Sequence, residues 1–220
     1  MELIDHLPEQ KSIWLYKNIM SEDERKSGLK VMEEMPESLW TQSVCTPYEV
    51  AQLRDHMPHS IWKSITRYTD TVKPTLEYIT GEILNVSYPS LLQMLYNPEV
   101  VGVTLDRRTE GMWLGPHNDV PTGDFEGHIG NKKGENYLEI TSVYYWNDDF
   151  TGGELEFYDP AITERFLAGE PYQEPLYKYK PVAGDLVCFT HDIPEHMITP
   201  VESGVRYSSQ TFYNRLRNPT

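Results

Sequence analysis

From about Leu91 onward, the chain divides into short segments rich in β-branched and aromatic residues, separated by Gly, Pro and Asp. Such segments are typical of β-strands, and many short strands at this spacing indicate a sandwich or a closed barrel. This half of the chain therefore has to form a β-core. The expected strands are 91–96, 100–106, 112–120, 137–147, 154–159, 185–191, 196–201 and 205–214.

The first 85 or so residues have a different pattern, which favours helices. Ser21 is a good N-cap, and Glu24, three residues later, completes a capping box before a helix that Pro36 would end. Residues 47–57 and 75–84 also have apolar residues at helical spacing. Helices followed by a helix-free second half predict an α+β protein in which N-terminal helices support one face of a sheet.

Length and composition favour one domain. A chain of 220 residues fits a single domain over 1–220, with a helical support region at 1–85 and a core at 86–214. It has no apolar run of roughly 20 residues, which a membrane helix needs, and its first ten residues do not resemble a secretory signal. Cys45 and Cys188 are the two cysteines, and we expect both to be reduced in a cytoplasmic protein.

The formal net charge of -15 limits the classes of partner. Binding to a phosphate backbone normally depends on Lys and Arg, so nucleic acid is not an expected partner. We expect a small-molecule or peptide partner and no membrane. Two interpretations of the acidity remain open, which are a well-solvated surface and a preference for a cationic substrate.

Of the seven histidines, only His117 has an acidic residue, Asp119, two positions later. In a strand, this spacing places both side chains on one face, roughly 6.5 Å apart along the backbone. They are then placed to share a metal ion. However, a His and an Asp two apart more often decorate a turn, and Gly115-Pro116 is a candidate turn. The pair alone therefore does not establish a site.

A second group begins at His196, which starts an expected strand, followed by a Glu-Ser-Gly turn that forms a tight hairpin with a second strand. Arg206 and Ser208 are two apart in that second strand, so both face the same side. A cavity with two histidines, a carboxylate and a buried arginine is costly unless each charge has a partner. A metal ion and a dicarboxylate would supply those partners.

Two histidines and one carboxylate on one face of an ion form the ligand set of non-haem iron(II) oxygenases. Three coordination positions then remain open, so a 2-oxo acid can chelate the ion and leave one position for oxygen. The distant carboxylate of such an acid needs a planar, two-pronged cation, which arginine provides better than lysine.

Together these motifs resemble the prolyl 4-hydroxylase-like branch of the 2-oxoglutarate/Fe(II)-dependent dioxygenase superfamily, over roughly 91–213. The family order is H-x-D, Tyr-x-Asn-Asp, Gly-Gly-x-Leu and a distal His about ten residues before Arg-Tyr-Ser. In this chain the four motifs are at 117–119, 145–148, 152–155 and 196–208.

The resemblance implies a double-stranded β-helix, also called a jelly roll or cupin-like core. In it the H-x-D strand and the distal-His strand face each other across the open end. It implies that His117, Asp119 and His196 are the catalytic metal ligands and that Arg206, with Tyr145 and Ser208, binds the co-substrate. For Tyr145, a purely structural role in the core is equally compatible. The implied cofactors are Fe(II), 2-oxoglutarate and O2, with ascorbate as a candidate reductant.

His191 is an alternative distal ligand, five residues before His196. It lies fifteen residues before Arg206, whereas His196 has the family spacing, so we expect His196 to be the ligand. His128 lies in a loop that we expect to be solvent-exposed or near the rim. The remaining histidines, His6, His56 and His59, fall in the helical half, where the family pattern has no ligand.

One departure from the family pattern precedes the first ligand. Relatives usually have a tyrosine some ten residues before that His, but Arg107 stands at this distance here. Arg107, Arg108 and Trp113 are candidates for a substrate wall, although a basic pair before a loop is more often solvated. The loop at 120–136 and an insertion at 159–182 are expected to flank the site, and either is a candidate lid.

The expected activity is hydroxylation of an unactivated C–H bond, with conversion of 2-oxoglutarate to succinate and CO2. The resemblance favours proline, peptidyl or free, and the alternative substrates are another free amino acid or a small metabolite. Two other classes of protein fit these motifs less well. A jelly-roll metal protein that does not use 2-oxoglutarate has no reason to place Arg206 beside Ser208, and a silent binding module would tolerate a broken ligand set.

Overall fold

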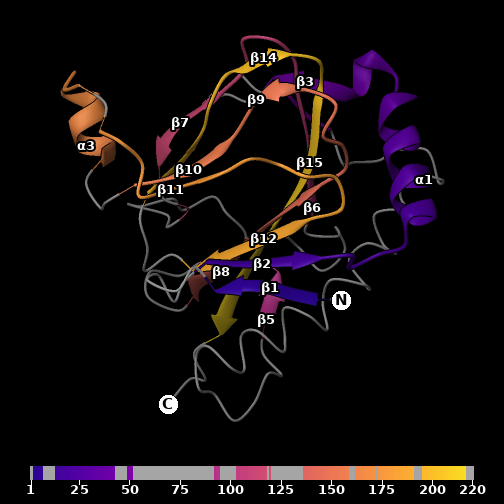
Figure 1. The fold of residues 1–220 in the computed structure, drawn as a ribbon, viewed down its shortest axis with the longest axis horizontal. Coiled ribbons are helices and arrows are strands. Elements are labelled where there is room, and N and C mark those ends of the chain that lie inside the picture. The colour runs from indigo at the N-terminus through magenta and orange to yellow at the C-terminus, as the bar shows by residue number, and fades with distance from the viewer. Residues whose placement is uncertain are drawn as a thin grey trace.

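Two antiparallel sheets form most of the described part of the chain (Figure 1). The computed structural model describes residues 2–6, 13–42, 49–51, 92–94, 103–117, 119, 136–158, 162–171, 173–190 and 195–216. Within these ranges the larger sheet contains, in spatial order, β1 (Glu2–His6), β2 (Ile13–Lys17), β12 (Leu186–Thr190), β8 (Asn136–Tyr145), β15 (Arg206–Leu216), β6 (Val103–Arg108), β4 (Glu49–Ala51) and β3 (Trp40–Gln42). A further strand, β5 (Leu92–Met94), also pairs with β15.

The smaller sheet carries the candidate ligands. Its described strands are, in spatial order, β11 (Tyr177–Tyr179), β10 (Leu155–Phe157), β13 (His196–Ile198) and β7 (Leu114–His117). A separate ladder joins β14 (Val201–Ser203) to β9 (Thr151–Gly152). The strands expected from 91 onward are thus confirmed in the described residues, although 196–201 is divided between β13 and β14.

The core lies between the two sheets, where the inner side chains of both meet. On β8, Val143 and Tyr145 point inward because alternate residues of a strand share one face. The fully assembled cluster contains Ile13, Val143, Tyr145, Leu155, Phe157, Tyr179, Val187, Phe189 and Ile198. Burying each large apolar side chain contributes about 1.5–3 kcal/mol. Two facing antiparallel sheets around one core match the predicted double-stranded β-helix.

Helix α1 (Glu22–Glu33) begins where the sequence predicts it. The Ser21 hydroxyl accepts a hydrogen bond from the Glu24 backbone N–H at 3.3 Å, and the Ser21 backbone N–H donates to the Glu24 carboxylate at 3.0 Å. The capping box is therefore confirmed. The helix ends before Pro36, and a short 3-10 helix, η1 (Glu37–Leu39), follows it. In Figure 1, α1 lies on the opposite side of the molecule from α3 (Ile162–Leu167).

Strands occupy part of the N-terminal region in which only helices were expected. The prediction of a helix over 47–57 was wrong for Glu49–Ala51, which pair with β3 and β6 as strand β4. Pairing within the sheet overrides weak helical spacing in so short a segment. The expected helix at 75–84 lies outside the described residues. Strands β1 and β2 extend the same sheet as β12 and β8, and the division of the chain at residue 85 stays a prediction.

The turn after β14 does not form the predicted hairpin. We expected the strand of His196 to fold back directly on the strand of Arg206, but β13 pairs with β7 and β10, whereas β15 lies in the larger sheet. Pro200 has no N–H for a ladder bond and separates β13 from β14. The segment therefore carries the chain from one sheet to the other.

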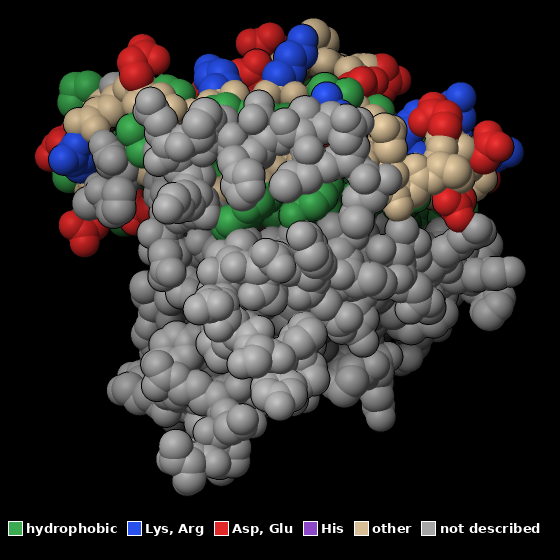
Figure 2. Space-filling model, turned by 60° about the horizontal axis from the view of Figure 1, so that its bottom comes forward, with side chains coloured by type: hydrophobic (Ala, Val, Ile, Leu, Met, Phe, Trp, Pro, Cys, Tyr) green, Lys and Arg blue, Asp and Glu red, His purple; other side chains and the backbone are tan. Residues whose placement is uncertain are grey.

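Acidic and basic side chains of the described residues are interspersed on the face in Figure 2. On α1 such groups form ion pairs, from Glu22 to Lys26 at 3.3 Å and from Lys30 to Glu34 at 3.6 Å. Mixed charge of this kind is typical of a solvated surface. Within the described ranges, no helix combines the length and the apolar character needed to cross a membrane.

Candidate metal centre and co-substrate pocket

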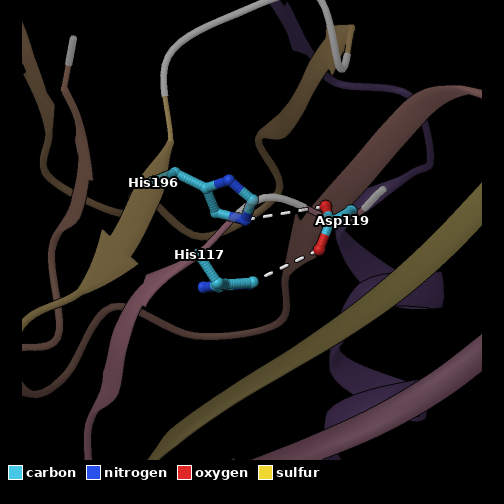
Figure 3. A group of neighbouring side chains, drawn as sticks. All are labelled: His117, Asp119 and His196. Atoms are coloured by element: carbon cyan, nitrogen blue, oxygen red, sulfur yellow. Dashed lines mark ion pairs between the residues drawn. The ribbon is translucent and has the colours of Figure 1, made fainter. Parts of the chain in front are cut away.

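Three potential metal ligands converge at one end of the smaller sheet (Figure 3). His117 is the last residue of β7 and His196 the first residue of β13, and the two are paired in the ladder between these strands. The Nε2 atom of His117 lies 3.4 Å from Asp119 Oδ1, and the Nε2 atom of His196 lies 3.6 Å from Asp119 Oδ2. The three ligand atoms lie within 4.8 Å of one another.

This geometry differs in two respects from the one expected from the sequence. Strand β7 ends at His117, so Asp119 lies in the bend beyond it and does not share a strand face with His117. The strands of His117 and His196 are also hydrogen-bonded neighbours in one sheet, whereas we expected them to face each other across the open end. The side chains still meet, because Asp119 turns back toward both imidazoles.

Neighbouring groups fix the orientation of two of these side chains. The Nδ1 atom of His117 lies 2.8 Å from the carbonyl oxygen of Gly115. A carbonyl oxygen only accepts, so Nδ1 carries the proton and Nε2 has its lone pair free for a metal. The Thr141 hydroxyl donates to Asp119 Oδ2 at 2.6 Å, which orients the carboxylate from the larger sheet.

Burial and mutual charge give the three groups different proton affinities. Burial, with the nearby charge of His117, lowers the pKa of His196 to about 3. Burial also opposes protonation of His117, but Asp119 outweighs it and raises the pKa of His117 above its usual value. For Asp119, burial raises the pKa, yet the two histidines and Thr141 outweigh burial and lower it. The centre thus offers an ionised carboxylate and a neutral His196 at neutral pH.

These three residues fit a first-row metal ion. Ligand atoms about 2.1 Å from a shared ion lie roughly 3 Å apart when they occupy adjacent positions. The separations of 3.4 and 3.6 Å between the carboxylate oxygens and the two Nε2 atoms are close to that spacing. Phe189 packs edge-on against His196 with ring centroids 4.7 Å apart, so one side of the centre is apolar. Imidazole, imidazole and carboxylate together form the set that binds iron(II) with open positions.

Arg206 begins β15 and is fully buried on the inner face of the larger sheet. Its Nη1 donates to the Ser208 hydroxyl at 2.8 Å, and its guanidinium lies 5.0 Å from the ring centroid of Tyr145. The expected proximity of Arg206, Ser208 and Tyr145 is therefore present. Among the described residues, Nε and Nη2 of Arg206 have no hydrogen-bond partner. Buried, unsatisfied guanidinium donors are costly, so this pocket suits a carboxylate ligand.

One strand connects the metal centre to this pocket. Thr141 and Tyr145 lie on the same inner face of β8, and they contact Asp119 and Arg206 respectively. Four residues of strand span roughly 13 Å. The sheet thus holds the candidate metal ligands and the candidate carboxylate site at a fixed separation.

A family model described as the 2OG-Fe(II) oxygenase superfamily matches residues 103–214, which is just over half of the chain. The matched range contains all of the site residues described above, including His117, Asp119, His196 and Arg206. The chain belongs to this superfamily. It is therefore an oxidoreductase of the dioxygenase type that uses Fe(II), 2-oxoglutarate and O2.

Solved structures share the fold of this oxygenase at low sequence identity. A 2OG-Fe(II) oxygenase family protein from Burkholderia pseudomallei is 13% identical with a TM-score of 0.61, covering 96% of this chain and 88% of its own. A Pseudomonas putida prolyl-4-hydroxylase is 13% identical with a TM-score of 0.60, covering 94% of each chain. A Trichoplax adhaerens prolyl hydroxylase, solved with a hypoxia inducible factor peptide fragment, is 13% identical with a TM-score of 0.57, covering 93% and 84%. A comparison with curated protein sequences gave no match.

Asn147, in the Tyr-x-Asn-Asp motif, positions the start of the arginine strand of this oxygenase. Its side-chain oxygen accepts from the Tyr207 backbone N–H at 2.8 Å, and its Nδ2 donates to the Val205 carbonyl at 2.7 Å. These two backbone groups flank Arg206. Asn147 therefore holds the backbone on both sides of the arginine, a role that we did not predict from the sequence.

The other predicted site residues divide into three groups. Arg107 lies on the outer face of β6, in an ion pair with Glu37, whereas Arg108 is fully buried on the inner face. Trp113 packs edge-on against Phe166 of α3, so part of the insertion at 159–182 lies against β7, and the expectation that the insertion flanks the site as a lid stays a prediction. The role of Trp113, Arg107 and Arg108 in a substrate wall stays a prediction. The side chain of His6, the residues His56, His59, His128 and His191, and the loop at 120–136 apart from the strand residue Asn136 lie outside the part of the structure that is described.

The contacts of Thr141 and Asn147 and the inward direction of Arg108 were not predicted from the sequence. For Thr141 a usable signal exists, because the alternation along 137–147 places it on the same face as Tyr145. For Asn147, the Tyr-x-Asn-Asp motif identifies the residue but does not show which groups it hydrogen-bonds. For Arg108 the sequence has no signal, because two adjacent arginines present opposite faces and either can be the inner one.

Proposed function

We propose that this oxygenase hydroxylates an unactivated C–H bond of a proline residue or of free proline, with conversion of 2-oxoglutarate to succinate and CO2. The observation that carries the proposal is that strand β8 contacts both groups, the three converging ligands through Thr141 and Asp119, and the buried Arg206 through Tyr145. Two neighbours of the same fold are named as prolyl hydroxylases, and the four ordered motifs of the chain favour that branch. We further propose that the protein acts in a reducing cytoplasm, which the free, buried Cys188 supports.

In this proposal each described side chain has a defined task. His117, Asp119 and His196 hold iron(II), with the His117 tautomer fixed by Gly115 and the carboxylate oriented by Thr141. Arg206 binds the distal carboxylate of 2-oxoglutarate through its available Nε and Nη2 donors, while Ser208 steadies Nη1. O2 is the oxidant, with one of its oxygen atoms entering the new hydroxyl group and the other entering succinate, and iron(II) with 2-oxoglutarate would supply the chemistry that activates it.

The ring of Tyr145 lies against the guanidinium of Arg206 and limits the space next to it. Burial is the largest influence on the Tyr145 hydroxyl and raises its pKa, although Arg206 opposes this shift. The hydroxyl therefore stays protonated at neutral pH and can donate to a carboxylate oxygen. It lies close enough to Arg206 for the guanidinium to favour its ionised form, which is consistent with the two groups contacting one ligand. We propose that Tyr145 and Arg206 bind the same carboxylate.

The first test needs no substrate. The purified apoprotein is mixed anaerobically with iron(II) and 2-oxoglutarate, and the weak visible charge-transfer band of the chelated oxo acid is recorded. We expect the band in the wild type, a much weaker band in Arg206→Ala, and an unchanged band in Arg107→Ala, which alters the outward-facing arginine. Iron binding without a band would contradict the assigned co-substrate site.

The second test concerns the substrate. Succinate release is measured with free proline, with proline-containing peptides and with other free amino acids, each compared with the uncoupled rate. Stimulation confined to proline or its peptides would support the proposal. Stimulation by another amino acid or metabolite alone would replace proline as the substrate while leaving the oxygenase assignment intact.

The third test concerns the distal ligand. His117→Ala or His196→Ala is expected to abolish iron-dependent turnover, because removal of one ligand leaves a two-residue set. His191→Ala serves as the matched control and is expected to retain turnover. Equal activity of His196→Ala and the wild type would show that His196 is not the ligand.

A further inference from the structure

Two consecutive arginines on β6 point to opposite sides of the larger sheet, as alternation along a strand requires. Arg107 faces outward, where it pairs with Glu37 at 2.8 Å and lies 4.8 Å above the ring of Trp40. Arg108 faces inward and is completely buried. Its partner across the ladder with β15 is Arg206, so the two inner arginines lie directly opposite each other.

The immediate surroundings of Arg108 form a polar row in the inner face. Asp106, two residues earlier on β6, lies 3.3 Å from Arg108 through Oδ2, and Gln210 donates to the same oxygen at 2.7 Å. Ser208 is the cross-strand partner of both Asp106 and Tyr145. Arg108 is therefore held by a buried carboxylate next to the residues that contact Arg206.

Arg108 and Arg206 act on the same two side chains. The charges of both arginines favour the ionised form of Asp106 and lower the pKa of Tyr145 against the larger effect of burial. The two guanidinium groups therefore share their polar surroundings.

The charge balance of this cluster favours an anionic ligand. Like charges directly opposite each other in a ladder are destabilising, and burial increases the cost. Arg108 and Arg206 are both buried and lie opposite each other, so an anion bound beside them would offset their mutual repulsion.

We propose that Arg108 is a second cationic contact for the distal carboxylate of 2-oxoglutarate, beside Arg206, and that it makes the oxygenase selective for dicarboxylic 2-oxo acids. Asp106 and Gln210 act as positioning residues that hold the guanidinium in place. The inference rests on the proposed function, in which Arg206 binds that same carboxylate. It adds a specificity-determining residue on the strand next to that of Arg206.

The test compares two oxo acids of equal length. The Fe(II) protein is titrated anaerobically with 2-oxoglutarate and with 2-oxopentanoate, which lacks the distal carboxylate, and both dissociation constants are taken from the charge-transfer band. We expect Arg108→Gln to raise the dissociation constant for 2-oxoglutarate by roughly 10- to 100-fold, as for loss of a charge-assisted contact, and to change that for 2-oxopentanoate by no more than about twofold. Arg108→Lys should recover part of the affinity.

Two controls separate binding from folding. Arg107→Gln removes the adjacent arginine from the outer face and is expected to leave both dissociation constants unchanged. The double variant Asp106→Asn with Arg108→Gln removes both buried charges together, so it avoids an unpaired carboxylate, and it should show the same loss of selectivity as Arg108→Gln. Thermal unfolding of each variant confirms that a folded protein is being titrated.

The outcomes distinguish this inference from the function on which it rests. If Arg206→Gln weakens 2-oxoglutarate binding but folded Arg108→Gln and the double variant bind it as the wild type does, the inference is wrong and the proposed function stands. An equal loss for both oxo acids would also overturn it, because the defect would then be general. If neither arginine affects 2-oxoglutarate binding, the assignment of Arg206 fails as well.

Discussion

Gly153 lies so close to Arg206 that a Cβ atom added to Gly153 would be 2.9 Å from the Cδ atom of Arg206. Gly153 has a φ of +62°, a conformation that favours glycine, and it belongs to the Gly-Gly-x-Leu motif of the family. The motif therefore has a direct purpose in this chain. It turns the backbone into β10 and leaves room for the arginine that we assign to the co-substrate.

Gly153→Ala is expected to displace the guanidinium of Arg206 and weaken 2-oxoglutarate binding by roughly tenfold or more, because a misplaced charge-assisted hydrogen bond costs about 1.5–3 kcal/mol. The measurement is the anaerobic dissociation constant for 2-oxoglutarate. Gly169→Ala is the matched control, because Gly169 has a similar φ of +74° with no atom within 4 Å of the added Cβ. An equal loss of 2-oxoglutarate affinity in both variants would show that backbone strain alone causes the effect.

Thr141→Val is expected to weaken metal binding, because it removes the hydroxyl that donates to Asp119 Oδ2 at 2.6 Å. Loss of a group that orients a metal ligand typically lowers metal affinity about 10- to 100-fold. The dissociation constant for iron(II), measured anaerobically by competition with a chelator, checks this. Thr141→Ser keeps the hydroxyl and should bind the metal nearly as well as the wild type. Equal affinities for all three proteins would remove Thr141 from the site.

Metal affinity is expected to rise with pH until His117 is fully deprotonated in the metal-free protein. The pKa of His117 is raised, whereas that of His196 is lowered to about 3, so His117 is the histidine of the pair that keeps its proton to the higher pH. Binding must displace that proton, so below the pKa of His117 affinity should fall by roughly tenfold per pH unit. Titration with iron(II) at several pH values, with proton release followed in parallel, measures this. A pH-independent affinity would contradict it.

The sequence predicted the strands, and it picked out the three candidate ligands that the structure brings together, because both depend on local spacing. The pattern of residues along the chain indicated the segments that form β6, β8, β12 and β15. The order of the family motifs identified His117, Asp119, His196 and Arg206 as candidate site residues. It did not predict β1 or β2, whose residues gain burial only by pairing across to β12, as Trp14 does opposite Cys188. The burial that stabilises these strands comes from contacts distant in sequence.

Orientation was harder to predict than position. Arg107 was singled out by its distance from His117, yet Arg108 is the residue that points inward, and one residue of register reverses the two faces of a strand. Asp119 was expected on a strand face with His117, but the strand ends before it. In both cases the side-chain direction depends on ladder pairing that the sequence does not specify.

Gly28 offers a test of packing at the helix whose start was predicted from sequence. It lies inside α1, where alanine is intrinsically better than glycine by about 1 kcal/mol. However, a Cβ on Gly28 would lie 2.2 Å from the indole carbon Cζ3 of the buried Trp146, and Trp146 donates through Nε1 to Ser209 of β15. We therefore expect Gly28→Ala to lower the free energy of unfolding by about 1–3 kcal/mol, because overpacking outweighs helix propensity.

Ser27→Ala on the exposed side of the same helix is the control for Gly28→Ala, because it changes propensity without adding a contact to Trp146. Its free energy of unfolding, from urea denaturation, should stay within about 0.5 kcal/mol of the wild type. If Gly28→Ala were as stable as Ser27→Ala, α1 would have to pack more loosely against Trp146 than described here. A destabilised Gly28→Ala would instead establish that the missing side chain at position 28 fixes how closely α1 approaches the larger sheet.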